Sequence, residues 1–245
     1  MIMNHHMPQF AVLGSLLLMM MLPVAPKPAL AADGWGITAG ADLRTRWIYR
    51  GMELGNSPQI QPSVFIRNGG FQAGLWASHS LSLATDSGDP GSVYRETNLW
   101  MQYTFTFESF SLTPYLQNHY NPVNDLTDFS SDGSHALQFQ LGLAGSEDLP
   151  FDVMGGWVFH GDDDNSLYVE AGYTLASGQN RIRTFISGTP AKAGFNGTDK
   201  AAVTQIGIQA ARILPITESF QLPLTVELIA NPYAKTTFGA LILSF

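Results

Sequence analysis

The stretch that decides the fold is Trp35–Arg50, WGITAGADLRTRWIYR. Successive side chains of a strand point to opposite faces, so this stretch divides into two sets. One set is apolar with aromatic ends: Trp35, Ile37, Ala39, Ala41, Leu43, Thr45, Trp47 and Tyr49. The other carries one acid and three arginines: Gly36, Thr38, Gly40, Asp42, Arg44, Arg46, Ile48 and Arg50. Such a strand exceeds the typical length of about 5–6 residues. It suits a tilted strand that crosses a bilayer, which needs roughly 9–11 residues, with its apolar face on lipid. On this stretch alone, a long strand of a soluble sandwich remains the alternative.

The same alternation returns along the chain and predicts twelve strands. For example, Leu137, Phe139 and Leu141 alternate with Gln138 and Gln140. The predicted strands cover 34–49, 59–67, 71–83, 94–107, 110–120, 135–144, 151–160, 166–175, 180–187, 201–212, 220–230 and 236–245. Single-chain bacterial membrane barrels have an even number of strands. The pattern therefore predicts an all-β fold, a transmembrane antiparallel up-and-down β-barrel of about twelve strands.

The connections between these strands alternate in length. Longer connections at 51–58, 84–93, 121–134 and 188–200 follow odd-numbered strands, whereas tight turns follow the second, fourth and eighth. Membrane barrels have short periplasmic turns and longer outer loops. Aromatic residues gather at the predicted strand ends, with Trp35, Phe71, Phe105, Phe107, Phe110, Phe151, Tyr173 and Phe220 at one side and Trp47, Tyr49, Tyr120, Trp157 and Phe159 at the other. Two aromatic girdles are typical of membrane–water interfaces, so both patterns favour a membrane barrel over a sandwich.

The first thirty-one residues are expected to be a secretory signal peptide. The apolar run at 10–22 is shorter than the roughly 20 residues of a transmembrane helix. Prolines and then Ala29-Leu30-Ala31 follow it, and these small residues form an A-x-A cleavage site. Cleavage near Ala31 leaves residues 32–245 as the barrel, in the outer membrane of a Gram-negative bacterium; an uncleaved anchor is the alternative. Lipid and lipopolysaccharide are the partners expected there.

Two stretches resemble known families. The final strand, FGALILSF, ends in Phe245 with Leu241 and Leu243 on its face, and resembles the carboxy-terminal signature of outer-membrane proteins. That resemblance implies recognition by the barrel-assembly machinery. Nearer the front, Tyr49-Arg50-Gly51, Pro58, Gln61 and the strand GFQAGLWAS at 70–78 resemble the TorF-type putative porin family, over roughly residues 40–85. The loop at 52–57 and residues 66–68 depart from that family's pattern. The resemblance implies an outer-membrane channel.

The inward faces of the predicted strands supply a candidate pore lining with charges of both signs and many amides. Its residues are Asp42, Arg44, Arg46, Glu96, Gln102, Gln138, Gln140, Glu170, Arg181 and Arg183. Arg44 and Arg46 predict an anion-attracting wall. In the alternative, the charges pair with one another, Glu170 with Arg183 for instance, and fill the lumen. A barrel of twelve strands is intermediate in width between narrow eight-stranded barrels and wide porins. The strand number is therefore compatible with a lumen that side chains fill. Inward Trp76, Trp100, Tyr115 and Tyr168 are the side chains suited to block it.

The function expected from these patterns is a porin-like channel for passive diffusion of small hydrophilic solutes. The alternatives are a filled-lumen barrel that acts through its outer loops and a membrane-embedded hydrolase. We expect no enzyme activity and no catalytic residues, since His79 and Ser80 alternate in one strand and no nucleophile–base arrangement is evident. The acidic run His160–Asn165 lacks calcium-loop spacing and is interpreted as a solvated outer loop. With a net charge of −8 and 13% charged residues, no basic patch suggests nucleic acid, and no metal or cofactor is expected.

Overall fold

The structure is a computed structural model that describes residues 34–55, 57–81, 93–122, 124–217 and 220–245. The predicted signal peptide and most of the connection at 84–93 lie outside the described residues. The strands are β1 (Gly36–Arg44), β2 (Ile48–Tyr49), β3 (Met52–Glu53), β4 (Gln59–Asn68), β5 (Phe71–Ser80), β6 (Arg95–Tyr103), β7 (Phe105–Thr106), β8 (Phe110–Tyr120), β9 (His135–Gly145), β10 (Phe151–His160), β11 (Leu167–Ser177), β12 (Asn180–Thr189), β13 (Ala202–Pro215), β14 (Gln221–Asn231) and β15 (Thr236–Ser244). A short 3-10 turn, η2, covers Gly194–Asn196.

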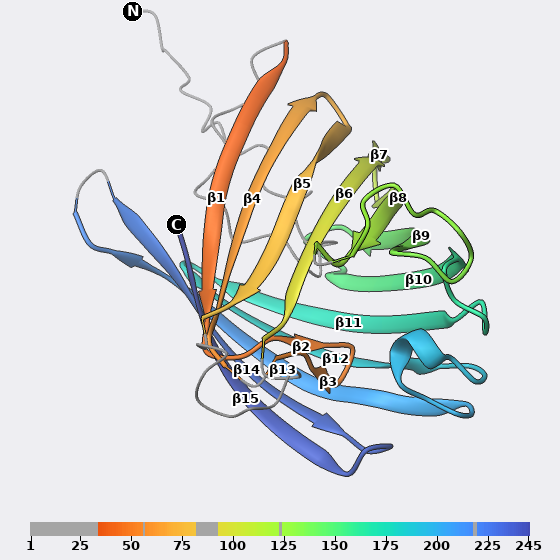
Figure 1. Cartoon of the computed structure of the whole chain (residues 1–245). Coiled ribbons are helices and arrows are strands. Elements are labelled where there is room, and N and C mark those ends of the chain that lie inside the picture. The colour runs from red at the N-terminus through yellow and green to blue at the C-terminus, as the bar shows by residue number, and fades with distance from the viewer. Residues whose placement is uncertain (1–33, 56, 82–92, 123, 218–219) are drawn as a thin grey trace, which may run out of the picture.

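The wall of the molecule is a closed antiparallel barrel of twelve strands (Figure 1). Each strand pairs with its sequence neighbours in the wall, and β7 continues β6 after a break at Thr104, so the two count as one. The predicted all-β, up-and-down, twelve-stranded barrel is thus confirmed. The described ranges contain no α-helix. No helical segment in them is long and apolar enough to cross a membrane.

The barrel closes where the first strand meets the last. Strand β1 pairs with β15 through Asp42 opposite Ser244 and Arg44 opposite Ile242. The backbone of Ala41 exchanges two hydrogen bonds with Phe245, at 3.2 Å and 2.9 Å. The terminal residue therefore takes part in closing the sheet.

Apolar side chains face outward and polar ones inward, as the alternation predicts. On β6, Leu99 is 55% exposed whereas the neighbouring Asn98 is fully buried. On β4, Ile60, Val64 and Ile66 are exposed, and their neighbours Gln59, Gln61 and Ser63 are buried. A soluble protein hides its large apolar residues. This molecule exposes them around the barrel and buries an interior rich in amides and charges.

Aromatic rings expected at one end of the strands lie on the outer surface. Trp35 packs edge-on against Phe71 with ring centroids 6.0 Å apart, and Phe107 stacks on Phe110 at 4.6 Å. At the other end, Trp157 contacts Phe159 at 5.6 Å. These rings occupy positions that suit an aromatic girdle.

The first predicted strand is wrong beyond residue 44. The prediction ran to Tyr49 and placed Trp47 and Tyr49 in the outer girdle, but β1 ends at Arg44. The chain then turns into the barrel, where β2 and β3 form a two-stranded hairpin (Figure 1). Trp47 is 2% exposed and Tyr49 is 8% exposed. The sequence pattern continued past the end of β1 because successive side chains of the hairpin also point to opposite faces, and both of these faces are packed.

Candidate functional site

The lumen is the candidate functional site, and the segment 45–55, here called the inner hairpin, is its central feature. The hairpin turns at Arg50 and Gly51, which both have positive φ angles of 51° and 87°. Two positive angles are typical of a two-residue type I′ turn, which favours Asn or Gly at its first position. Arg50 is thus an unusual residue held in a left-handed conformation, which points to constraints from its surroundings.

The tip of the inner hairpin is fixed to the wall opposite its origin. Asn231 donates a side-chain hydrogen bond to the carbonyl of Gly51 at 3.0 Å. A β-carbon at Gly51 would lie 2.2 Å from the carbonyl oxygen of Thr204, so only glycine fits. Arg50 Nη1 donates to the side-chain oxygen of Asn196 at 2.9 Å, so the η2 loop also contacts the tip. The hairpin therefore spans the lumen from β1 to β13 and β14.

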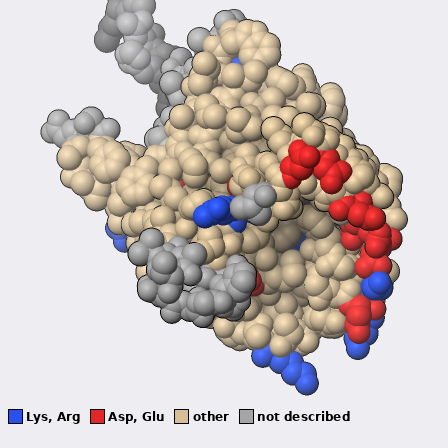
Figure 2. Space-filling model, in the orientation of Figure 1, with Lys and Arg blue, Asp and Glu red and all other residues tan. Residues whose placement is uncertain are grey.

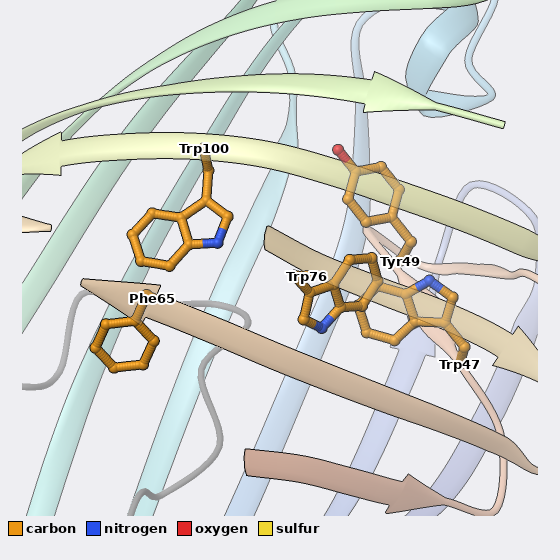
Figure 3. Packing of buried hydrophobic residues seen from close by; sticks show 5 residues of the cluster. All are labelled: Trp47, Tyr49, Phe65, Trp76 and Trp100. Atoms are coloured by element: carbon orange, nitrogen blue, oxygen red, sulfur yellow. The ribbon is translucent and has the colours of Figure 1, made fainter. Parts of the chain in front are cut away.

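The two faces of the inner hairpin pack against different parts of the wall. On one face, Trp47 and Tyr49 join an aromatic cluster with Phe65, Trp76 and Trp100, shown in Figure 3. The ring centroids of Trp47 and Trp76 lie 5.7 Å apart. On the other face, Ile48 packs with Phe185 and Ile229. The expectation that Trp76, Trp100, Tyr115 and Tyr168 point inward agrees with these positions, since Tyr115 borders the aromatic cluster and Tyr168 is fully buried.

Residues of the TorF-like pattern meet one another around this hairpin. Gln61 donates to the hydroxyl of Ser78 at 3.1 Å, and Ser78 donates in turn to Gln59. Gln59 then donates to the carbonyl of Leu54, at the end of the inner hairpin. A β-carbon at Gly74 would lie 2.5 Å from that of Phe65, so glycine leaves room for this ring of the cluster. These residues thus seat the inner hairpin on β4 and β5.

The charged residues of the predicted lining are mostly buried and paired. Arg44 lies 3.8 Å from Glu227 and stacks over Trp47. Asp42 accepts a hydrogen bond from Ser244 at 2.6 Å. Arg46 lies beyond the end of β1, on the inner hairpin, and pairs with Glu53 at 3.4 Å while its side chain stays partly exposed. These pairs offset much of the positive charge that Arg44 and Arg46 would otherwise present to a solute.

A second group of charges lies on the opposite wall. Arg183 binds Glu170 at 2.7 Å and also donates to both carboxylate oxygens of Asp152. The pairing of Glu170 with Arg183, considered from the sequence, is confirmed. Tyr168 donates to Glu170 at 2.9 Å. Arg181 lies two residues from Arg183 on β12 and forms no ion pair with a described residue.

A polar network on β6, β8 and β9 joins three further predicted residues. Glu96 lies 2.6 Å from His119 Nδ1, and His119 Nε2 lies 3.3 Å from the side-chain oxygen of Gln138. Gln140 donates to the same oxygen at 3.0 Å. Gln102 is buried farther along β6. The predicted lining did not include Arg50, although the sequence placed this residue on the charged face of the first stretch and in an Arg-Gly pair.

The loop between β10 and β11 carries the acidic run Asp162–Asp164. Asp164 accepts hydrogen bonds from Lys192 at 2.7 Å and from the backbone of Gly194 at 2.9 Å, which ties two loops together. The hydrogen bond from Lys192 lowers the pKa of the Asp164 carboxyl below its ordinary value. Figure 2 shows acidic side chains gathered along one side of the visible face. No group of three or more His, Cys, Asp or Glu in the described ranges is arranged to hold a metal ion.

Comparison with known proteins adds no family assignment. No protein-family model and no curated protein sequence matches the chain.

Proposed function

We propose that this chain is an outer-membrane channel through which small hydrophilic solutes diffuse passively. The observation that carries the proposal is the closed barrel with an apolar outer face and a polar, charged interior. Such a surface is stable where lipid covers the outer face, and such an interior suits a watery path. The inner hairpin would narrow that path and decide which solutes pass.

A second candidate is a barrel with a filled lumen that acts through its outer loops. The aromatic cluster of Trp47, Tyr49, Phe65, Trp76 and Trp100 favours this candidate, because it lies inside the barrel (Figure 3). The two candidates differ in one measurable property, the ionic current through the protein. A hydrolase finds less support: His79 is exposed whereas the adjacent Ser80 is buried, so the two side chains lie on opposite faces.

The proposal includes a location and a route to it. Residues 1–31 would direct export and be cleaved near Ala31, and the barrel would reside in the outer membrane of a Gram-negative bacterium among lipid and lipopolysaccharide. Recognition of Phe245 by the barrel-assembly machinery, and kinship with the TorF-type putative porins, are proposals that rest on the resemblances in the sequence.

Planar-bilayer recordings of the protein purified from membranes test the channel. We expect small, steady conductance steps from the parent protein, and larger steps from a Trp47→Ala/Tyr49→Ala double variant, because two large rings leave the lumen. A Leu126→Ala/Phe129→Ala variant, which removes two exposed side chains of an outer loop, is the control and should conduct like the parent.

Other outcomes separate the candidates. Current from the double variant alone would support the filled-lumen barrel, with the inner hairpin as its plug. Silence from every variant, with the folded state verified by circular dichroism, would contradict a channel.

A further inference from the structure

The guanidinium of Arg50 is a buried cation that has no carboxylate partner in the described part of the chain. Its side chain is 4% exposed, and no described acid lies within ion-pair distance of it. The guanidinium lies over the rings of Tyr49, at 4.8 Å, and Tyr168, at 4.2 Å. One of its nitrogens, Nη1, is engaged by Asn196. Burying a charge without a counter-charge is costly, so this position calls for an explanation.

Two buried acids of the lumen are engaged elsewhere. Glu96 pairs with His119, and Glu170 pairs with Arg183. Tyr168 lies between Arg50 and Glu170: it presents its ring to the guanidinium and its hydroxyl to the carboxylate. The described acids therefore supply no ion-pair partner to Arg50.

Gln138 points a donor towards the same place. The side chain is fully buried, and its oxygen already accepts from Gln140 and contacts His119. Those contacts turn its amide nitrogen the other way, where it has no hydrogen-bond partner among the described protein groups. An unsatisfied buried donor costs about 1–3 kcal/mol, so this nitrogen also calls for an acceptor.

The two donors, Gln138 Nε2 and Arg50 Nη2, both lie close to Gly156 on β10. A β-carbon at this residue would lie 3.2 Å from Gln138 Nε2 and 3.4 Å from Arg50 Nη2. The two nitrogens thus face one side of the same stretch of backbone, which carries no side chain. A positive group and a neutral donor that converge in this way fit a negatively charged acceptor.

We propose that Arg50 Nη2 and Gln138 Nε2, above Gly156, form a binding site for a small anion, either a free inorganic ion or the carboxylate of a solute. The site lies at the tip of the inner hairpin, so an anion there would bridge the hairpin to β9 and β10. Binding would stabilise the folded protein, and the stabilisation would grow with the logarithm of the anion concentration once this exceeds the Kd. The statement that solutes reach this site in transit rests on the proposed channel, whereas binding itself does not.

Substitutions with matched controls are available. Gly156→Ala places a methyl group between the donors and leaves the charge unchanged, and Gly155→Ala is its control, because nothing lies within 4 Å of a β-carbon there. Arg50→Asn removes the charge and creates an Asn-Gly pair, which favours the same type I′ turn. Gln138→Glu supplies a carboxylate beside Arg50 and should occupy the site permanently.

The experiment measures the thermal midpoint of the near-ultraviolet circular dichroism of the full protein in detergent. Sodium formate, sodium chloride and sodium 2-morpholinoethanesulfonate are compared at one ionic strength; the last is a bulky sulfonate without a carboxylate and serves as the reference. We expect a higher midpoint in formate and chloride than in the sulfonate for the parent and Gly155→Ala. The difference should vanish in Gly156→Ala, Arg50→Asn and Gln138→Glu. A shift with formate alone would support a carboxylate site, and shifts with both salts a general small-anion site.

Two results would overturn the site. Equal midpoints of the parent in all three salts would mean that the Gln138 amide is rotated and satisfies Arg50 with its own oxygen. A salt difference that survives in Gly156→Ala and Arg50→Asn would be a general salt effect. Conductance distinguishes the two proposals: a salt shift without current contradicts the channel alone, and current without a salt shift contradicts the site alone.

Discussion

At the scale of single residues, glycine decides where the inner hairpin can sit. Gly51 combines a positive φ angle with a close approach to the Thr204 carbonyl, and both requirements exclude a side chain. Gly178, in the turn between β11 and β12, shares the positive angle, at 58°, but nothing lies within 4 Å of a β-carbon there. A comparison of alanine substitutions at Gly51 and Gly178 therefore separates the cost of backbone strain from the cost of displacing the hairpin from the wall.

We predict that Gly51→Ala destabilises the protein by clearly more than Gly178→Ala. The control should cost roughly 1–2 kcal/mol, the strain of a left-handed alanine. Gly51→Ala should in addition displace the hairpin and change the near-ultraviolet signal of Trp47 and Trp76, whose rings are in contact. Denaturant unfolding followed by circular dichroism measures both effects; equal costs and unchanged spectra would argue against a fixed hairpin.

Charge placed on the outer face tests which side chains meet lipid. Leu75 is 47% exposed at the middle of β5, between Val64 and Leu99 of the neighbouring strands. We predict that Leu75→Arg costs roughly 2–4 kcal/mol in a bilayer, the value for a midplane position. Ile37→Arg, near the start of β1, should cost roughly 0–1 kcal/mol, as at an interface. Equal costs in unfolding from lipid vesicles would disprove the proposed orientation in the membrane.

At the scale of elements, alternation predicts strands well where one face is apolar throughout. The predicted ranges 110–120 and 151–160 coincide with β8 and β10, whose neighbouring residues differ sharply in polarity or exposure. The prediction failed at 45–49 because Trp47, Ile48 and Tyr49 alternate between two apolar surroundings inside the lumen. Periodicity reports which side chains share a face, and it does not report whether that face meets lipid or protein.

The contacts of Asp164 with Lys192 and Gly194 join two loops, and we expect the strength of this connection to depend on pH. The pKa of Asp164 is lowered by its hydrogen bond to Lys192, so the tie is present above the ordinary aspartate pKa and is lost as the pH falls through the lowered value. We expect the Gly194 amide, which donates to Asp164, to exchange faster with solvent below that value. Asp164→Asn should weaken this protection at neutral pH, and Asp163→Asn should not; protection that is independent of pH would contradict the tie.

At the scale of the whole molecule, the ring of strands followed from local patterns, whereas the lumen did not. Each wall strand pairs with a neighbour in sequence, so turns and alternation are enough to order eleven of the contacts in the ring. The interior joins residues that are distant in the chain, such as Arg50 with Asn196 and Gly51 with Asn231. No local pattern carries that information, which is why the predicted lining did not include Arg50 or the contacts of the inner hairpin with the far wall.

The joint between β1 and β15 has a consequence for how the molecule assembles. The inner hairpin follows β1 directly, and Thr45 at its base bonds to Leu241 of β15 at 3.0 Å. The junction of β1 with β15, which closes the barrel, therefore lies beside the base of the inner hairpin that occupies the lumen. Contacts between residues this far apart in sequence form slowly. We expect the inner hairpin to enter the lumen before this junction closes, so that the backbone contact of Phe245 with Ala41 completes both the wall and the enclosure of the hairpin.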